Sequence, residues 1–318
     1  MWPVNRSQCQ PLALPAQPLP AHEPPDLTLK LILIFYRRLL KLLSRWRGDL
    51  ISEPVASPQM AEVIRSNRAV IGKIKQWVPP DLISHSIFRY GVNPDTEHLL
   101  DLPLDAECTH TDLLVYFGRN SKQPCKYLEL GVSVGKTFWQ ILNNCAPCEC
   151  WGFDIEEMTP VLRSQLVELS REEWPSPPDS IKKTPSSITR FVHRESGSKV
   201  VYICADIFDE KAWEKLTGEK FNLVLSDALH SAPALEFEWA HLIRVGILHP
   251  EEVIVMWDDL NGEMKTWFLE KRAAIAKHLS VDSSKVDAVF LNGWLGRREF
   301  PHRLGLAMKP SAKPRLGA

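Results

Sequence analysis

The chain has 318 residues, of which 44% are hydrophobic, so it is long and apolar enough for one large or two modest folded domains. Its 38 basic and 39 acidic side chains almost cancel, which excludes a strongly basic nucleic-acid binder, and we expect no nucleic-acid partner. Seven cysteines follow no small-scaffold spacing, and several lie inside apolar runs. They predict reduced thiols and a cytoplasmic protein.

The first predicted region, residues 1–56, is a disordered proline-rich leader followed by a basic amphipathic helix. Seven prolines fall within the first 25 residues and prevent a helix there. The next segment begins at Leu27 and ends at Arg47. Four cations between residues 30 and 41 interrupt the roughly 20 apolar residues that a membrane crossing needs. We expect no spanning helix here; the segment either makes peripheral contact with an anionic membrane surface or packs on the domain.

Residues 57–124 are predicted to form a helical cap, because a helical pattern over 60–77 ends at Pro79 and Pro80. From residue 125 to 310, short β-rich runs alternate with helix-length segments, and a short tail, 311–318, follows. The stretch 159–198 is too long for a simple crossover and is rich in proline. It predicts a helix with an inserted loop that acts as a lid.

The β-rich runs predict an α/β fold with a doubly wound, mostly parallel, seven-stranded sheet behind the helical cap and the leader. Gly293, Gly296 and Pro301 separate the last two runs without a helical pattern, which predicts an antiparallel hairpin and an antiparallel last strand. The predicted strands are 127–130, 150–154, 200–205, 221–226, 253–257, 288–291 and 303–308.

The most informative motif follows the first predicted strand, where Gly131 and Gly135 flank Ser133 just before a helix start. A phosphate-binding loop that ends in Gly-Lys-Thr has four residues between its glycines, and this loop has three. A dinucleotide fingerprint needs glycine where Ser133 and Lys136 stand. A sulfonium cofactor has no phosphates to hold but needs acceptors for its ribose hydroxyls, which Asp154 at the end of the next strand provides. The pattern therefore favours S-adenosylmethionine.

The run Leu128-Glu-Leu-Gly-Val-Ser-Val-Gly135 resembles the first motif of class I S-adenosylmethionine-dependent methyltransferases, and the resemblance extends over residues 126–309. It implies a cofactor site in which Glu129, Gly131, Ser133 and Gly135 line the methionine and ribose side. It further implies that Asp154 holds the ribose and that Asp206 meets the adenine amine. Ser133 departs from the glycine that many members have at this position.

Carboxylates also follow the fourth and fifth predicted strands, at Asp227 and at the pair Asp258 and Asp259. Oxygen donors at adjacent strand ends are the ligands that Mg²⁺ prefers. The pattern resembles metal-dependent O-methyltransferases of the catechol and caffeoyl-ester type, and its Asp-Asp pair is similar to the macrocin-type sugar O-methyltransferases. Asp227, Asp258 and Asp259 are the predicted metal ligands, and the acceptor is expected to be a hydroxyl of a small molecule.

His230 comes three residues after Asp227 and is the predicted general base, because a neutral imidazole accepts a proton near pH 7. Asp227 is the other residue with a predicted catalytic role. His302, in the last hairpin, either reaches the site or caps the sheet. The alternatives from other classes are a non-catalytic adenosine-binding scaffold and an NTPase that uses Lys136 and Thr137. Cys125, Cys145, Cys148 and Cys150 offer a zinc interpretation, which we discounted because no second CxxC follows.

Overall fold

A computed structural model describes residues 50–77, 108–291 and 302–311. The predicted leader, the segment from Leu27 to Arg47 and most of the tail lie outside these residues. From Asp49 onward the chain forms one unit by its internal contacts. None of the helices within the described ranges combines the length and the hydrophobicity that crossing a membrane requires.

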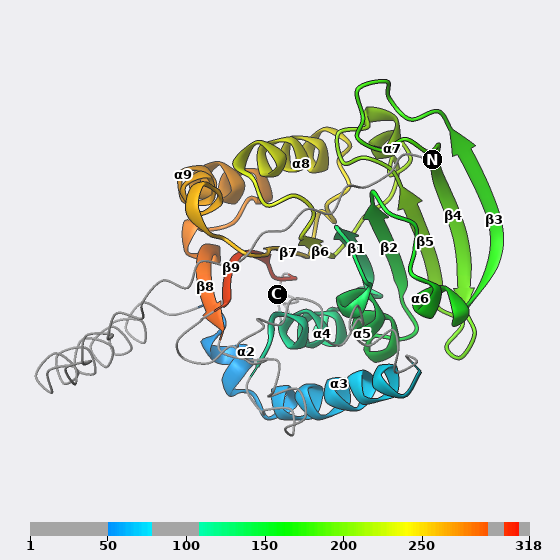
Figure 1. Cartoon of the computed structure of the whole chain (residues 1–318). Helices are drawn as coiled ribbons and strands as arrows, with labels where there is room; N and C mark the ends of the chain where they lie inside the picture. The colour runs from blue at the N-terminus through cyan, green and yellow to red at the C-terminus, as the bar shows by residue number, and fades with distance from the viewer. Residues whose placement is uncertain (1–49, 78–107, 292–301, 312–318) are drawn as a thin grey trace, which may run out of the picture. The chain divides into compact units, whose positions relative to one another are not determined.

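The structure is built on a nine-stranded sheet with the order β3-β4-β5-β2-β1-β6-β7-β9-β8 (Figure 1). The strands β1, β2, β5, β6 and β7 are parallel to one another, and the remaining pairings are antiparallel. In chain order, the strands are β1 (Lys126–Leu130), β2 (Glu149–Asp154), β3 (Leu166–Trp174), β4 (Ser186–His193), β5 (Lys199–Cys204), β6 (Leu223–Ser226), β7 (Val253–Trp257), β8 (Val286–Leu291) and β9 (His302–Lys309).

The predicted α/β class, the mostly parallel sheet and the antiparallel last hairpin are confirmed, but the predicted strand number of seven is wrong. The two additional strands, β3 and β4, form a hairpin on the outer edge next to β5. Seven of the nine residues of β3 are exposed and most of these are polar, so the strand has no apolar alternation from which it could be recognised. The predicted helix in this stretch is reduced to α6 (Pro160–Ser164).

Helices cover both faces of the sheet, as a doubly wound arrangement requires (Figure 1). Side chains of β1 alternate between two cores: Tyr127 packs with the helices of one face, and Leu128 and Leu130 pack with those of the other. The first face carries α3 (Pro58–Trp77), α4 (His110–Asn120) and α5 (Lys136–Asn144). The second carries α7 (Glu210–Glu214), α8 (Ala232–Arg244) and α9 (Gly262–Leu279).

The predicted N-terminal helix is present as α3, preceded by the short α2 (Ser52–Ala56). Its apolar side joins the same core as α4 and α5, through Met60 and Val63. Arg68 forms a two-pronged ion pair with the buried Asp112 of α4, at 2.9 and 3.0 Å. Asp112 also completes a capping box with Thr109, so one carboxylate both starts α4 and fixes α3 against it.

The order of the strands defines where a ligand is expected. From β1 the chain moves outward to β2 and β5 on one side, and then returns to β6 and β7 on the other side. The loops that follow β1 and β6 therefore diverge, and ligands of such sheets bind in the crevice at the carboxyl ends of these strands.

Candidate functional site

The loop after β1 is a tight turn that only glycine permits at its start. Gly131 has φ +85°, and a Cβ atom on it would lie 2.2 Å from the carbonyl oxygen of Asp227. Gly135, with φ +78°, is the N-cap of α5 and would place a Cβ 2.9 Å from Leu162. The backbone of the loop consequently passes very close to the loop after β6.

Asp154, the last residue of β2, holds this turn in place. Its carboxylate accepts hydrogen bonds from the amide of Ser133 at 2.6 Å and from the amide of Glu156 at 2.8 Å. Ser133 has φ +49°, an uncommon conformation for a residue other than glycine. Each carboxylate oxygen still has a second lone pair. Asp154 is thus oriented by the backbone and retains acceptor capacity for a ligand.

Asp206 follows β5 and lies on the same side of the sheet edge. One of its oxygens accepts from the amide of Phe208 at 3.1 Å, and the other accepts from the Ser180 hydroxyl at 2.7 Å. Ser180 belongs to the loop between β3 and β4, so the extra hairpin reaches back to the end of β5.

Asp154 and Asp206 line one common cavity of about 460 Å³, as the cofactor prediction requires. This volume is in the range of sites for small molecules and cofactors. The walls are mostly apolar, and they include four aspartates but no lysine or arginine among the described residues. The apolar part of the wall is formed by Phe153, Ile155, Pro177, Ile181, Ile207, Phe208 and Leu229.

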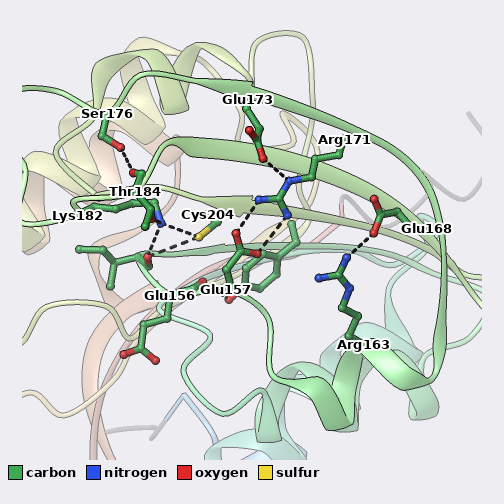
Figure 2. A network of polar contacts seen from close by, with 12 residues as sticks. Glu156, Glu157, Arg163, Glu168, Arg171, Glu173, Ser176, Lys182, Thr184 and Cys204 are labelled. Atoms are coloured by element: carbon green, nitrogen blue, oxygen red, sulfur yellow. Dashed lines mark hydrogen bonds and ion pairs between the residues drawn. The ribbon is translucent and has the colours of Figure 1, made fainter.

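The loop between β3 and β4, which the sequence predicted as a lid, supplies Pro177, Asp179, Ser180 and Ile181 to the cavity wall. Figure 2 shows how its base is fixed. The buried Lys182 ammonium donates to the carbonyl of Ile155 at 3.2 Å, to the Thr184 hydroxyl at 3.0 Å and to the Cys204 sulfur at 3.1 Å.

The hairpin itself is tied to the segment after β2. Arg171 of β3 pairs with Glu157 and with Glu173, both at 2.8 Å (Figure 2). These pairs are partly exposed and contribute little each. The pair with Glu173 lies within β3, so the pair with Glu157 and the contact of Lys182 with Ile155 are the ones that join the hairpin to the segment after Asp154.

Three of the predicted cofactor residues do not belong to the wall of this cavity. Ser133 contributes its amide to Asp154, and Gly135 starts α5. Glu129 is buried in β1 and accepts a hydrogen bond from the Tyr127 hydroxyl at 2.8 Å. Burial raises the pKa of Glu129 well above its usual range. A neutral Glu129 is the form that this environment favours.

A second group of polar side chains, which we call the polar edge, lies at the ends of β6 and β7, on the other side of the glycine turn formed by residues 131–135. His230 Nε2 is 3.1 Å from Asp227 Oδ1, and His230 Nδ1 is 3.8 Å from Asp259 Oδ2. His302 Nε2 is 2.5 Å from Asp258 Oδ1 and 3.5 Å from Asp259 Oδ1. The structure therefore brings all four predicted catalytic and metal-binding residues together and places His302 with them.

The ionisation of this group is set by burial and by neighbouring charges. Burial raises the pKa of Asp227 to about 7, although the hydrogen bond with His230 acts in the opposite direction. The same hydrogen bond raises the pKa of His230, against the effect of burial. Near neutral pH, the pair of Asp227 and His230 is thus able to hold or release a proton.

Asp258 and His302 form a charged pair. Burial alone would raise the pKa of Asp258, but His110 and His302 lower it to about 2. Burial alone would lower the pKa of His302, but its hydrogen bonds with Asp258 and Asp259 raise it to about 10.

Sequence reasoning missed His110, and it named Lys136 only for the NTPase alternative and not as a member of this group. His110 begins α4, and burial lowers its pKa to about 4, so its ring is neutral. Lys136 begins α5, and burial lowers its pKa to about 8, against the attraction of Asp258 and Asp227. The spacing of Thr109 and Asp112, which form a capping box, could have indicated the start of α4, but no local pattern places that helix end beside β7.

No family model and no curated protein matched the sequence. Solved structures did match. The N-methyltransferase NodS from Bradyrhizobium japonicum, in complex with S-adenosyl-L-homocysteine, is 14% identical; the match covers 71% of this chain and 97% of NodS, with a TM-score of 0.37.

The methyltransferase MycE of mycinamycin biosynthesis, in complex with Mg and S-adenosylhomocysteine, is also 14% identical, with a TM-score of 0.33; the match covers 64% of this chain and 47% of MycE. Spermidine synthase from Thermotoga maritima is 12% identical over 64% of this chain and 57% of its own, with a TM-score of 0.34. At these identities and TM-scores, the matches give no argument about the activity of this chain, and the proposal below rests on its own site.

Proposed function

We propose that this protein is an S-adenosylmethionine-dependent methyltransferase that methylates a hydroxyl group of a small molecule. The observation that carries the proposal is the single cavity in which Asp154 and Asp206 lie on a common wall beside Gly131. Ribose hydroxyls and an adenine amine are hydrogen-bond donors, and both carboxylates retain acceptor capacity for them. The apolar side chains around them suit the faces of an adenine ring.

The charge of the cavity favours this cofactor over a nucleoside triphosphate. Its described walls carry Asp154, Asp179, Asp206 and Asp209 and no cation. Carboxylates repel phosphates but attract a positively charged sulfonium group. The NTPase alternative depends on Lys136, which is buried near Asp227 and Asp258 at the polar edge instead of lining the cavity.

The polar edge next to the glycine turn supplies the acceptor chemistry in this proposal. His230 accepts the proton of the acceptor hydroxyl, and its contact with Asp227 stabilises the imidazolium that results. Asp227 also orients the ring. The hydroxyl oxygen, once deprotonated, attacks the methyl group at the sulfonium sulfur, so that an oxygen–carbon bond forms as the carbon–sulfur bond breaks.

The proposed mechanism also includes a divalent metal ion at the polar edge. Asp227, Asp258 and Asp259 are oxygen donors at adjacent strand ends and fit a magnesium-class ion by their chemistry. An ion there would supply positive charge that makes a bound hydroxyl easier to deprotonate.

Methyl transfer from a labelled donor tests this function. The purified protein, a metabolite extract and S-adenosylmethionine with an isotopically labelled methyl group are incubated together, and products are analysed by mass spectrometry. We expect label on the oxygen of a small molecule, and loss of that product after exhaustive chelation. Cofactor binding without any labelled product from diverse extracts would favour the non-catalytic adenosine-binding scaffold, and label on nitrogen would contradict O-methylation. Full activity after chelation would remove the ion from the mechanism.

A further inference from the structure

The polar edge contains a second set of possible metal ligands that differs in chemistry from the three carboxylates. One ligand atom from each of His110, Asp258 and His302 lies within 4.8 Å of the other two. The three residues come from the start of α4, the end of β7 and the start of β9, so the fold brings together distant parts of the sequence. Among the described residues, neither Asp227 nor Asp259 belongs to this set.

The surroundings of the three residues orient them towards one another. The rings of His110 and His302 meet edge to face, with centroids 4.9 Å apart. The Nε2 atom of His110 contacts the hydroxyls of Thr137 at 3.3 Å and Thr111 at 3.2 Å. Asp258 Oδ1 accepts from the amide of Asp259 at 2.9 Å. Supporting contacts of this kind typically hold metal ligands in position.

We propose that His110, Asp258 and His302 form a binding site for a zinc-class divalent transition metal, with one coordination position left for a substrate oxygen. Two imidazoles and one carboxylate are a donor set that Zn²⁺ takes in catalytic sites, whereas Mg²⁺ prefers oxygen donors throughout. Asp258 also belongs to the three carboxylates proposed above for a magnesium-class ion. A zinc-class ion bound by His110, Asp258 and His302 would therefore take the place of that ion at the polar edge. Zinc binding there is independent of whether methyl transfer occurs.

One ion can bind all three groups after side-chain movements of about an ångström, because their ligand atoms lie within 4.8 Å of one another. Ligand atoms on a tetrahedral zinc ion, with bonds of about 2.0 to 2.2 Å, lie about 3.3 to 3.6 Å apart. The 2.5 Å contact of His302 with Asp258 therefore has to open by about an ångström. The side chain of Asp258 is 9% exposed and that of His302 is 24% exposed, so the site is sheltered but reachable from solvent.

Calorimetric titration of the chelator-treated full-length protein with ZnCl₂ tests the site, with bound metal quantified by mass spectrometry. We expect one zinc per chain, not displaced by millimolar MgCl₂. His110→Ala and His302→Ala are each expected to weaken zinc binding by about tenfold to a hundredfold or more. His249→Ala is the matched control, because its ring accepts hydrogen bonds from the amides of Glu251 and Glu252 and lies outside the proposed triad, so the variant should bind zinc like the parent.

Asp227→Asn separates the two sets of ligands, because Asp227 contacts His230 and lies outside the proposed triad. Zinc affinity that is unchanged in Asp227→Asn supports the triad. A loss as large as that in His110→Ala would overturn it, as would unchanged affinity in both histidine variants or no zinc binding by the parent.

A cobalt-substituted protein gives a second readout, since its visible absorption reports the ligands and geometry directly. Where an alanine variant fails to fold, His110→Gln or His302→Gln removes the ring nitrogen and keeps a polar side chain, and its zinc affinity decides the question. S-adenosylhomocysteine binding is measured on the same samples. If the parent protein binds S-adenosylhomocysteine but not zinc, only the metal site is contradicted. If it binds zinc but not S-adenosylhomocysteine, only the proposed cofactor is contradicted.

Discussion

The two sides of the carboxyl edge of the sheet are built in different ways. At the ends of β1, β2 and β5, the carboxylates of Asp154 and Asp206 are oriented by backbone amides and surrounded by apolar walls. At the ends of β6 and β7, Asp227 and Asp258 are oriented by histidines. Amides have a fixed charge state, whereas imidazoles titrate. The first side is therefore suited to holding a ligand and the second to moving protons or binding an ion.

The largest expected effect is a loss of turnover without a loss of cofactor binding when the side at β6 and β7 is changed. Replacing Asp227 or Asp258 by alanine should lower turnover by about a thousandfold, because each removes a group that the proposed reaction uses. Neither residue lines the cavity, so the affinity for S-adenosylhomocysteine should stay within about threefold, or about 0.6 kcal/mol, of the parent value. Labelled-methyl assays and calorimetry measure the two quantities. Full turnover in either variant would contradict the assignment.

The glycine turn joins the two sides, and Gly131 in this turn should be the position that tolerates substitution least. In Gly131→Ala, the new Cβ meets the backbone of Asp227 and Ala228 at 2.2 and 2.4 Å. We expect the free energy of unfolding to fall by more than about 3 kcal/mol, as seen for severe backbone clashes.

Gly197→Ala is the matched control for that variant. Gly197 also has a positive φ, +69°, but within the described part of the chain no heavy atom beyond its chain neighbours lies within 4 Å of the position that an alanine Cβ would take. It should lose only about 1 to 2 kcal/mol, the cost of the backbone conformation itself. Equal losses in chemical denaturation would show that the contact with the β6 loop is not what requires Gly131.

The ends of β6 and β7 should make the stability of the protein depend on pH, because a buried carboxyl group lies next to them. Glu238 of α8 is fully buried and accepts a hydrogen bond from Ser226 at the end of β6, at 2.5 Å. Burial raises its pKa to about 8. A folded-state pKa above the unfolded value gives stability that is present at low pH and is lost as the pH rises towards 8.

Glu238→Gln should remove this dependence. Its stability relative to the parent should change little near pH 4 and become more favourable by on the order of 4 kcal/mol at pH 8, because each unit of the pKa shift corresponds to about 1.4 kcal/mol. Denaturation curves at several pH values measure the difference. Parallel curves for parent and variant would mean that Glu238 is charged in the folded protein.

The smallest expected effect is on the cofactor side. Asp154→Asn places an NH₂ group against the amide of Ser133 or that of Glu156, which costs about 1 to 3 kcal/mol. The affinity for S-adenosylhomocysteine should fall about tenfold or more. Asp282→Asn is the control, because Asp282 caps a short helix through the amide of Ser284 and does not line the cavity. Affinity unchanged in Asp154→Asn would remove Asp154 from the cofactor site.

The parts of the fold with a strong local signal were predictable from sequence. The parallel strand β7 is a continuous apolar run, β1 is buried and rich in leucine, and Gly131 stands where no side chain fits. The hairpin of β3 and β4 was not predictable, because β3 is exposed and charged and obtains its structure by pairing with β4. Asp154 and Asp206 were predicted as cofactor residues from their places at strand ends, and both line the cavity. His110 was missed because its position depends on how α4 packs, which no local pattern encodes.

Calorimetry with S-adenosylmethionine, S-adenosylhomocysteine and ATP tests the central proposal most directly, that the cavity shared by Asp154 and Asp206 holds an adenosyl sulfonium. We predict micromolar binding of the first two ligands at one site per chain, and no binding of ATP, because the described walls carry carboxylates and no cation. Binding of ATP alone, or of none of the three, would contradict it.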